Sequence, residues 1–310
     1  MQKASYLGLD IGSISTKAVL IDSTNGNILD STYLWTQGDP INAVRRAIAA
    51  ILGKHPHTSI IGIGTTGSAR KLSAAMLDAS VCKNEITAHA TGTVSVYPDV
   101  RTILEIGGQD SKLILIEDGL VIDYAMNTLC AAGTGAFLSS QALRLNVAIE
   151  DFGDLALKAN RPANIASRCA VFAESDLVHK AQIGYSKEEI IAGLCTAVAQ
   201  NFVSNLTKGK ATKAPIVFQG GVSKNIGVVE AFERILGHKI QVHPDGHLMG
   251  ALGVALLCKK QAVNQSFDRS ILDQTFETDG DYCDKCGNSC ELIHIRINGQ
   301  SVDTWGRRCS

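Results

Sequence analysis

The chain has 310 residues, of which 45% are hydrophobic and 19% are charged, and its formal net charge at pH 7 is −1. A chain of this length and composition can bury a large core and is expected to form two lobes, and its balanced charge argues against a protein that binds nucleic acid or a membrane surface. No apolar run approaches the roughly 18 to 20 residues of a membrane-spanning helix. The N-terminal residues lack the apolar segment of a secretion signal, so a cytoplasmic protein is predicted. The nine cysteines then favour thiol or metal chemistry over disulfides.

The first predicted element is a β-hairpin over residues 7–22, where two apolar runs flank a Gly-Ser turn. The backbone N–H groups, two hydroxyls and one ammonium group around this turn are suited to a phosphate tail. The carboxylate that ends the first strand can hold a hydrated Mg²⁺ ion, which would bridge to the phosphates. The candidate residues are Asp10, Gly12, Ser13, Ser15 and Lys17. An ordinary surface hairpin is the alternative for this stretch alone, because short glycine motifs are common.

Helical and strand-like patterns follow the first hairpin. Apolar residues at helical spacing predict a helix over residues 39–53 that packs against the first sheet, and a short buried strand is expected at 60–64. Another helix is expected around His89. Cys82 and His89 are interpreted as packed side chains, because no second ligand lies at metal spacing.

A second copy of the hairpin pattern occupies residues 101–119. It has an acidic residue, Glu105, in its first strand, and Gly107, Gly108 and Gln109 follow in the turn. Two phosphate hairpins in one chain suggest two lobes that close on one nucleotide.

A third glycine pair, Gly220 and Gly221, ends a short β-rich segment and precedes a helical pattern. Glycine backbone there offers a surface for an adenosine. The sequence contains no Gly-x-x-x-x-Gly-Lys-Ser/Thr loop and no strand-linked Gly-x-Gly-x-x-Gly pattern, so a P-loop or dinucleotide-binding fold is disfavoured.

Two cysteines, Cys130 and Cys169, each open a predicted helix, where unpaired N–H groups and the helix dipole favour a thiolate. Two thiolates are too few for a four-iron cluster, which takes four, but a two-fold dimer would pool four of them. A pair of partly buried free thiols is the alternative on these residues alone. Cys195 and Cys258 lie in helical apolar patterns and are interpreted as small core residues.

The order of these motifs resembles that of the actin-like ATPase superfamily, and the resemblance covers roughly residues 5–258. The segments MNTLCAAGTGAFL and SRCAVFAESD are, in addition, similar to those of the activator components of 2-hydroxyacyl-CoA dehydratases and the related ATPase subunits of benzoyl-CoA reductase. The resemblance implies an α/β fold of the two-lobed actin-like, or ribonuclease H-like, type. It would have one lobe at 1–95 and a second, carrying the cluster helices, at 96–258.

The same resemblance implies an ATP-driven electron-transfer activator. Such a protein is a homodimer in which one four-iron four-sulfur cluster is held by two cysteines from each subunit. It takes an electron from ferredoxin or flavodoxin and passes it to a dehydratase or reductase partner. Which substrate that partner would act on is not encoded in this chain.

The resemblance also implies roles for individual residues. Asp10, Glu105 and Gln109 would be catalytic, although the wider superfamily often has Asp in place of Glu105. Cys130 and Cys169 would be the cluster ligands. The residues around ATP and Mg²⁺ would be Gly12, Ser13, Ser15, Lys17, Gly107, Gly108, Gly133, Gly135, Gly220 and Gly221.

The C-terminal part has a different character. Residues 259–280 are polar and are interpreted as a linker, and residues 281–310 as a Cys-rich metal-binding tail. Its thiols form a C-x2-C-x3-C pattern with a fourth cysteine further on: Cys283, Cys286, Cys290 and Cys309. Zinc is the first expectation and an iron–sulfur cluster the second, with unligated thiols as the alternative. Because the chain stops one residue after Cys309, we expect it to be a fragment of a longer protein, the first product of a split gene or a truncated chain.

Two rival functions share the hairpins. A kinase of a small metabolite would need a carboxylate base on the substrate side and gives no reason for Cys130 and Cys169. A regulatory ATP-binding module would need neither hydrolysis nor iron.

Overall fold

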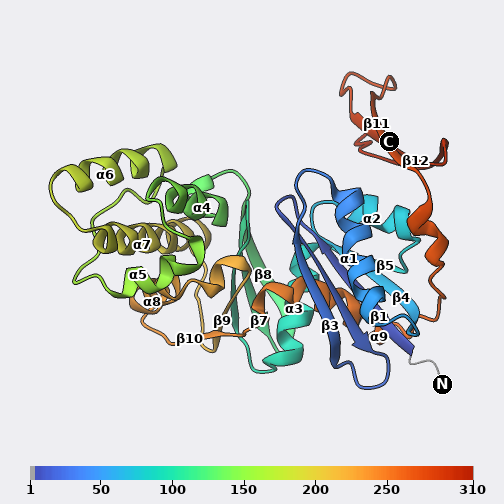
Figure 1. Ribbon diagram of the computed structural model, residues 1–310, viewed down its shortest axis with the longest axis horizontal. Helices are drawn as coiled ribbons and strands as arrows, with labels where there is room; N and C mark the ends of the chain where they lie inside the picture. The colour runs from blue at the N-terminus through green and yellow to red at the C-terminus, as the bar shows by residue number, and fades with distance from the viewer. Residues whose placement is uncertain (1–3, 310) are drawn as a thin grey trace. The chain divides into compact units, whose positions relative to one another are not determined.

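A computed structural model describes residues 4–309, which divide into two compact units (Figure 1). The first unit contains the chain up to Ala88 and again from Gly250 onward, and the second is His89–Met249. The sequence had suggested a first lobe ending at residue 95 and a second ending at 258. The last helix of the predicted second lobe, α9 (Met249–Lys260), instead lies almost entirely in the first unit.

The first unit is built on a five-stranded sheet in the order β3-β2-β1-β4-β5. β1 is antiparallel to β2 and parallel to β4. Two helices, α1 and α2, accompany the sheet, and the α1 side chains Val44, Ile48 and Ile51 belong to the same core as Leu7 and Leu9 of β1. The elements are β1 (Ala4–Ile11), β2 (Ser15–Asp22), β3 (Ile28–Trp35), α1 (Pro40–Lys54), β4 (Ser59–Thr66), α2 (Arg70–Leu77) and β5 (Val81–Cys82).

Two glycines explain why α9 packs on this sheet. A Cβ atom on Gly8 of β1 would lie 1.9 Å from the Ala251 carbonyl oxygen, and one on Gly64 of β4 would lie 2.6 Å from that of Val254. These distances leave no room for a side chain. The backbone of α9 therefore approaches the two central strands closely, which fixes the helix to the first unit.

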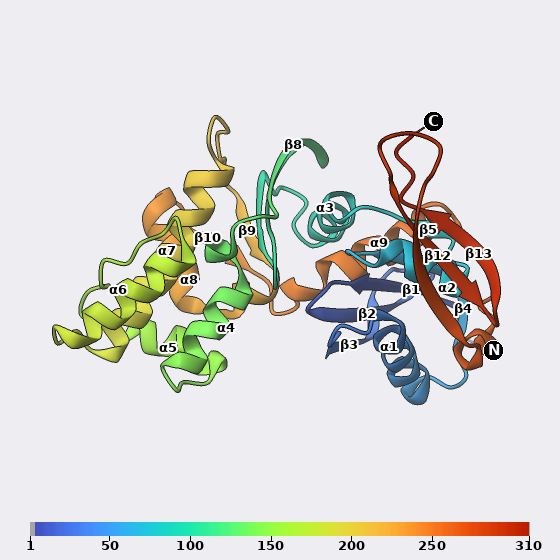
Figure 2. The ribbon, with the colours of Figure 1, turned by 90° about the horizontal axis from the view of Figure 1, so that it is seen from above.

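The second unit repeats this architecture. Its sheet has the order β10-β9-β6-β7-β8, which read backwards matches the first sheet strand for strand. Helices α4 to α8 gather on one side of the sheet, as Figures 1 and 2 show. The unit contains α3 (Glu85–Val96) at its start, β6 (Thr102–Ile106), β7 (Ser111–Glu117), β8 (Leu120–Asn127), α4 (Gly135–Arg144), α5 (Phe152–Leu157), α6 (Ala170–Gln182), α7 (Lys187–Leu206), β9 (Ile216–Gln219), α8 (Ile226–Leu236) and β10 (Ile240–Val242).

The long helix α7 is the centre of the second core. Ile191, Leu194, Val198 and Phe202 are fully buried on it, and a capping box at Ser186 defines its start. Phe232 of α8 packs edge-on against Phe202, with ring centroids 5.3 Å apart. This helix therefore provides a rigid support for the loops that pass over it.

The C-terminal extension folds into a three-stranded antiparallel sheet, β11 (Phe276–Tyr282), β12 (Glu291–Ile297) and β13 (Gln300–Trp305). β12 contacts α2 (Figure 2), and Phe276 enters the core of the first unit.

The segment before this sheet, which composition suggested to be a linker, is bonded to the body of the first unit. Gln265 and Phe267 donate backbone hydrogen bonds of 2.8 and 3.1 Å to Ile61 and Ile60 of β4. Within residues 4–309, no helix is long and apolar enough to cross a membrane.

Candidate functional site

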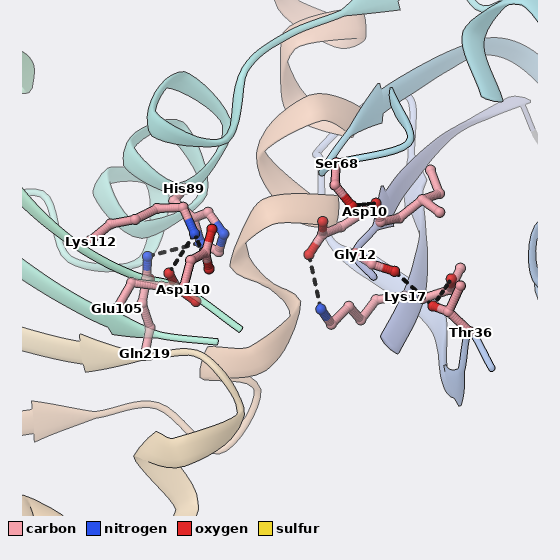
Figure 3. Close-up of polar contacts among 12 residues, drawn as sticks. Asp10, Gly12, Lys17, Thr36, Ser68, His89, Glu105, Asp110, Lys112 and Gln219 are labelled. Atoms are coloured by element: carbon pink, nitrogen blue, oxygen red, sulfur yellow. Dashed lines mark hydrogen bonds and ion pairs between the residues drawn. The ribbon is translucent and has the colours of Figure 1, made fainter. Parts of the chain in front are cut away.

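The first hairpin forms as the sequence predicts, with Gly12 in the turn between β1 and β2 (Figure 3). The Gly12 N–H donates to the Ser15 carbonyl at 3.0 Å. Asp10 and Lys17 face each other across the strands, and the Lys17 ammonium lies 3.2 Å from Asp10 Oδ2. Asp10 is buried while Ser13 is exposed at the turn. A carboxylate, an ammonium group and an exposed turn thus stand together at one end of the sheet.

The second hairpin has the same register. Gly107 N–H donates to the Asp110 carbonyl at 3.0 Å, and Glu105 pairs across the strands with Lys112. Lys112 is only 1% exposed, and its ammonium lies 2.9 Å from Glu105 and 2.8 Å from Asp110. Asp10–Lys17 and Glu105–Lys112 are therefore equivalent pairs in a duplicated hairpin. Two carboxylates surround the Lys112 ammonium, a pairing that a buried lysine needs.

A positive-φ glycine supports each hairpin from the neighbouring parallel strand. Gly220, after β9, has φ +88°, and a Cβ on it would lie 2.3 Å from the Ile106 carbonyl oxygen. Gly67, after β4, has φ +93°, and its Cβ would lie 2.3 Å from the Ile11 carbonyl oxygen. Gly67 is thus the counterpart of Gly220. Gly221, by contrast, is exposed, and a Cβ there would meet nothing within 4 Å.

Gln219, directly before Gly220, is completely buried and held by two side chains of α3 (Figure 3). Its Nε2 lies 3.0 Å from His89 Nδ1, and the Thr93 hydroxyl donates to its Oε1 at 2.6 Å. The Thr93 hydroxyl also lies 2.7 Å from the His89 carbonyl oxygen, so Gln219, His89 and Thr93 form one buried hydrogen-bonded group. His89 is therefore a hydrogen-bonded core residue, as expected, whereas Cys82 is exposed rather than packed.

The loops that carry Cys130 and Cys169 lie together in the second unit. The Cys130 thiol contacts the carbonyl of Arg168, the residue before Cys169, at 3.7 Å. Asn201 of α7, completely buried, joins the same loops: its Nδ2 donates to the Ser167 carbonyl at 2.6 Å and to the Cys130 sulfur at 3.5 Å. Both thiols are half-buried.

The two cysteines differ in their backbone setting. Cys169 caps the 13-residue helix α6, as predicted. The prediction that Cys130 opens a helix is wrong, because only a single 3-10 turn (Ala131–Gly133) follows it. Thr134 then adopts an extended conformation and caps α4, its hydroxyl accepting from Phe137 N at 3.4 Å. The helix-dipole argument therefore applies to Cys169 alone.

The Cys130 loop is also joined to the second hairpin. The Gly135 N–H donates to the Gly107 carbonyl and the Ala136 N–H to the Gly108 carbonyl, both at 2.9 Å. A Cβ on Gly135 would lie 2.9 Å from that Gly107 oxygen, so glycine permits the contact. Gly133 is buried, and a Cβ there would lie 2.4 Å from Asn201 Oδ1. Both glycines thus serve close packing between the hairpin, the Cys130 loop and α7.

The tail cysteines approach one another at one end of the three-stranded sheet. Cys283 Sγ and Cys309 Sγ are 3.6 Å apart, and Cys283, Cys290 and Leu292 form a small buried cluster with Cys309 packed on it. As they stand, no three or more His, Cys, Asp or Glu side chains within residues 4–309 form a group that could hold a metal ion. Cys195 and Cys258 are core residues, as predicted, and burial raises the pKa of each thiol to about 12.

Several site residues were missed by reading the sequence. Asp110 and Lys112 of the second hairpin were given no role, and Gly67 was not recognised as the counterpart of Gly220. Asn201 had no signal, because a single Asn in an apolar helix gains a meaning only from the loops packed on it. Gly67 could have been found by aligning the two halves of the chain on their hairpins.

The sequence is similar to those of ATPases and activators of acyl-CoA dehydratases. Residues 7–258 match the model of the BadF/BadG/BcrA/BcrD ATPase family. The (R)-2-hydroxyglutaryl-CoA dehydratase activating ATPase of Acidaminococcus fermentans is 34% identical over 83% of this chain and 97% of its own length. The activator of lactoyl-CoA dehydratase of Anaerotignum propionicum is 35% identical over 83% and 98%.

A solved structure shows the same fold. The activator of the 2-hydroxyisocaproyl-CoA dehydratase from Clostridium difficile, with bound ADPNP, has a TM-score of 0.78 and 32% identity and covers 83% of this chain and 95% of that one. The two hairpin-bearing sheets are accordingly those of the actin-like ATPase fold. With a family match over most of its length, the chain belongs to the BadF/BadG/BcrA/BcrD ATPase family.

Proposed function

We propose that this ATPase is an electron-transfer activator: it hydrolyses Mg-ATP and delivers a low-potential electron to a 2-hydroxyacyl-CoA dehydratase or a related reductase. Relatives named as activators of such dehydratases support the role. The observation that carries it is the hydrogen-bonded connection between the Gly107-Gly108 turn and the loop of Cys130. A metabolite kinase has no use for that connection.

The nucleotide part of the proposal assigns the phosphates and Mg²⁺ to the two hairpins and the adenosine to Gly220 and Gly221. Backbone N–H groups at glycine turns bind anions, and Mg²⁺ prefers carboxylate oxygen, which Asp10 supplies. Each carboxylate pairs with a lysine, but the partner of Glu105 is the buried Lys112, whose side chain is 1% exposed against 15% for Lys17. We therefore give Glu105 a role in holding the second turn and leave metal binding to Asp10.

The redox part assigns Cys130 and Cys169 to a four-iron four-sulfur cluster shared by two subunits. The residues fit such a group, because both thiols are half-buried, their loops are in contact, and large apolar side chains beside them are exposed. Leu129 is 97% exposed and Val171 and Phe172 are each 67% exposed. Exposed apolar residues around an incomplete ligand set suit a face that a second copy covers.

The bound cluster would supply one-electron chemistry, and the chain's own residues would supply control. A change in the Gly107-Gly108 turn on phosphate binding moves the acceptors of the Gly135 and Ala136 N–H groups. The first turn of α4 and the Cys130 loop then have to follow. A change of the bound nucleotide would thereby displace Cys130, one of the proposed cluster ligands.

Ferredoxin or flavodoxin is the proposed electron donor, and the cytoplasm is the proposed location. The four tail cysteines take no part in this function.

The test is purification without oxygen, followed by iron analysis and measurement of subunit number. We expect a brown dimer with about one four-iron cluster per two chains, because only pooled cysteines complete four ligands. Cys130→Ser and Cys169→Ser should each lose the iron, whereas Cys82→Ser, at an exposed cysteine outside these loops, should keep it. An iron-free dimer after anaerobic reconstitution would refute the redox part. A phosphorylated metabolite in place of free phosphate would favour the kinase.

A further inference from the structure

The C-terminal sheet brings together four thiols that the family match, which ends at residue 258, does not include. The sulfur atoms of Cys283 and Cys309 are 3.6 Å apart, and Cys290 is buried in the same small cluster. Cys286 lies in the loop between Cys283 and Cys290. From this gathering we propose that Cys283, Cys286, Cys290 and Cys309 together bind one zinc ion as a structural site.

The sulfur separation of this one pair fits two thiolates bound to the same metal ion. Four thiolates around zinc at about 2.3 Å, placed tetrahedrally, have sulfur atoms roughly 3.8 Å apart. The observed 3.6 Å between Cys283 and Cys309 is close to that edge. In a four-iron cluster each thiolate binds a different iron atom, so the ligands stand further apart. A disulfide would need sulfur atoms about 2.05 Å apart.

The backbone around the thiols is arranged as in a ligand-bearing turn. Cys283 N–H donates to the Cys290 carbonyl at 2.8 Å, which closes the loop between β11 and β12. Within that loop, Ser289 N–H donates to the Cys286 carbonyl at 3.3 Å. The Arg308 N–H points at the Cys290 sulfur, 3.3 Å away. Hydrogen bonds from N–H groups to sulfur stabilise a thiolate and orient it for a metal.

A glycine returns the fourth ligand to the other three. Gly306 has φ +107°, and a Cβ on it would lie 2.1 Å from the Glu291 carbonyl oxygen. Only glycine therefore allows the segment after β13 to pass over the start of β12. This path brings Cys309 beside Cys283.

The tail also needs what a metal provides. Its own buried cluster consists of Cys283, Cys290 and Leu292, with Cys309 packed against them. Phe276 and Ile297 anchor the other end of the sheet to the core of the first unit, so the cysteine-bearing end is the one with little buried apolar surface of its own. Zinc bound by these four thiolates would give the free energy that holds this end of the sheet together.

The experiment uses the full-length protein, purified anaerobically without chelator and analysed for zinc and iron. We expect about one zinc per chain. Cys309→Ser should weaken zinc binding by more than the roughly 10- to 100-fold that the loss of a hydrogen bond to a ligand costs. Cys82→Ser is the matched control and should bind zinc normally. Cys130→Ser should lose iron and keep zinc, which separates this proposal from the redox function.

A second measurement does not depend on a variant that folds. Cobalt(II) exchanged into the unaltered chain should give the absorption of a tetrahedral site with sulfur-to-cobalt charge transfer, and excess zinc should abolish it. Three outcomes would overturn the proposal: unchanged zinc binding by Cys309→Ser, iron that this substitution removes, or a zinc-reconstituted chain in which all four tail thiols are alkylated as readily as Cys82.

Discussion

Asn201 is the residue whose removal most directly tests how the two cysteine loops are held. Its amide donates to the Ser167 carbonyl and the Cys130 sulfur and accepts from Asn205 Nδ2 at 3.1 Å. Asn201→Ala removes these bonds at a site with no exposed surface. A lost neutral hydrogen bond costs about 1 kcal/mol, and a buried group left unpaired costs about 1–3 kcal/mol. We therefore expect a loss of about 2–3 kcal/mol, which lowers the melting temperature by about 5–10 °C for a unit of this size.

The assay combines thermal unfolding with peptide mapping of thiol alkylation. Asn201→Ala should melt earlier, its Cys130 should alkylate faster, and anaerobically prepared protein should retain less iron. Gln200→Ala is the matched control on the same helix: Gln200 is the exposed neighbour of Asn201, so this substitution should change the stability by less than about 0.5 kcal/mol. Equal effects of the two substitutions, or an unchanged alkylation rate of Cys130, would refute the role of Asn201 as a positioning residue.

Three further predictions concern the nucleotide site and the core. Asp10→Ala should abolish Mg-ATP hydrolysis, measured as phosphate release, and leave the iron content unchanged, because the carboxylate and the thiolates belong to separate sites; unchanged turnover would remove Asp10 from the mechanism. Gly220→Ala should cost about 1–3 kcal/mol in unfolding free energy and weaken ATP binding, because an alanine at φ +88° would press on the Ile106 carbonyl, whereas Gly221→Ala should fold normally. Burial raises the pKa of Cys195 from 9.0 to about 12, so between these values the thiol is neutral in the folded chain and ionised in the unfolded chain. Its contribution to stability should therefore be intact below about pH 9 and be lost towards pH 12. Alkylation of Cys195 in the native chain as fast as that of the exposed Cys82 would contradict this burial.

The parts of the fold that could be predicted are those whose signal lies within one short stretch. Gly12, Gly107 and Gly220 each end an apolar run, so the strands and turns around them were found from spacing alone. The helix predicted to begin at Cys130 begins instead after Thr134. The Thr134 side chain caps the helix start there, and this capping outweighs the apolar periodicity of the preceding residues.

The remaining site features depend on contacts between distant segments. The hydrogen bonds of Lys112 follow from its register opposite Glu105, which requires knowing where the turn falls. The bond between Asn201 and the Cys130 sulfur joins residues separated by 71 positions. Charge and spacing in the sequence could indicate that phosphates and thiols matter, but they could not show which backbone hydrogen bonds, from Gly135 and Ala136 to the Gly107-Gly108 turn, connect the two.

Residues 263–267, which follow α9 and bond to β4, cover part of the outer edge of that strand. β5 pairs with Gly64 and Thr65 of β4 and does not reach the earlier residues of that strand. The carbonyls of Ile60 and Ile61 accept hydrogen bonds from Phe267 and Gln265 instead. An uncovered strand edge is a template for pairing with other molecules. A chain shortened after α9 to match its relatives would therefore tend to self-associate through β4, and it would be a poor stand-in for the full protein in measurements at high concentration.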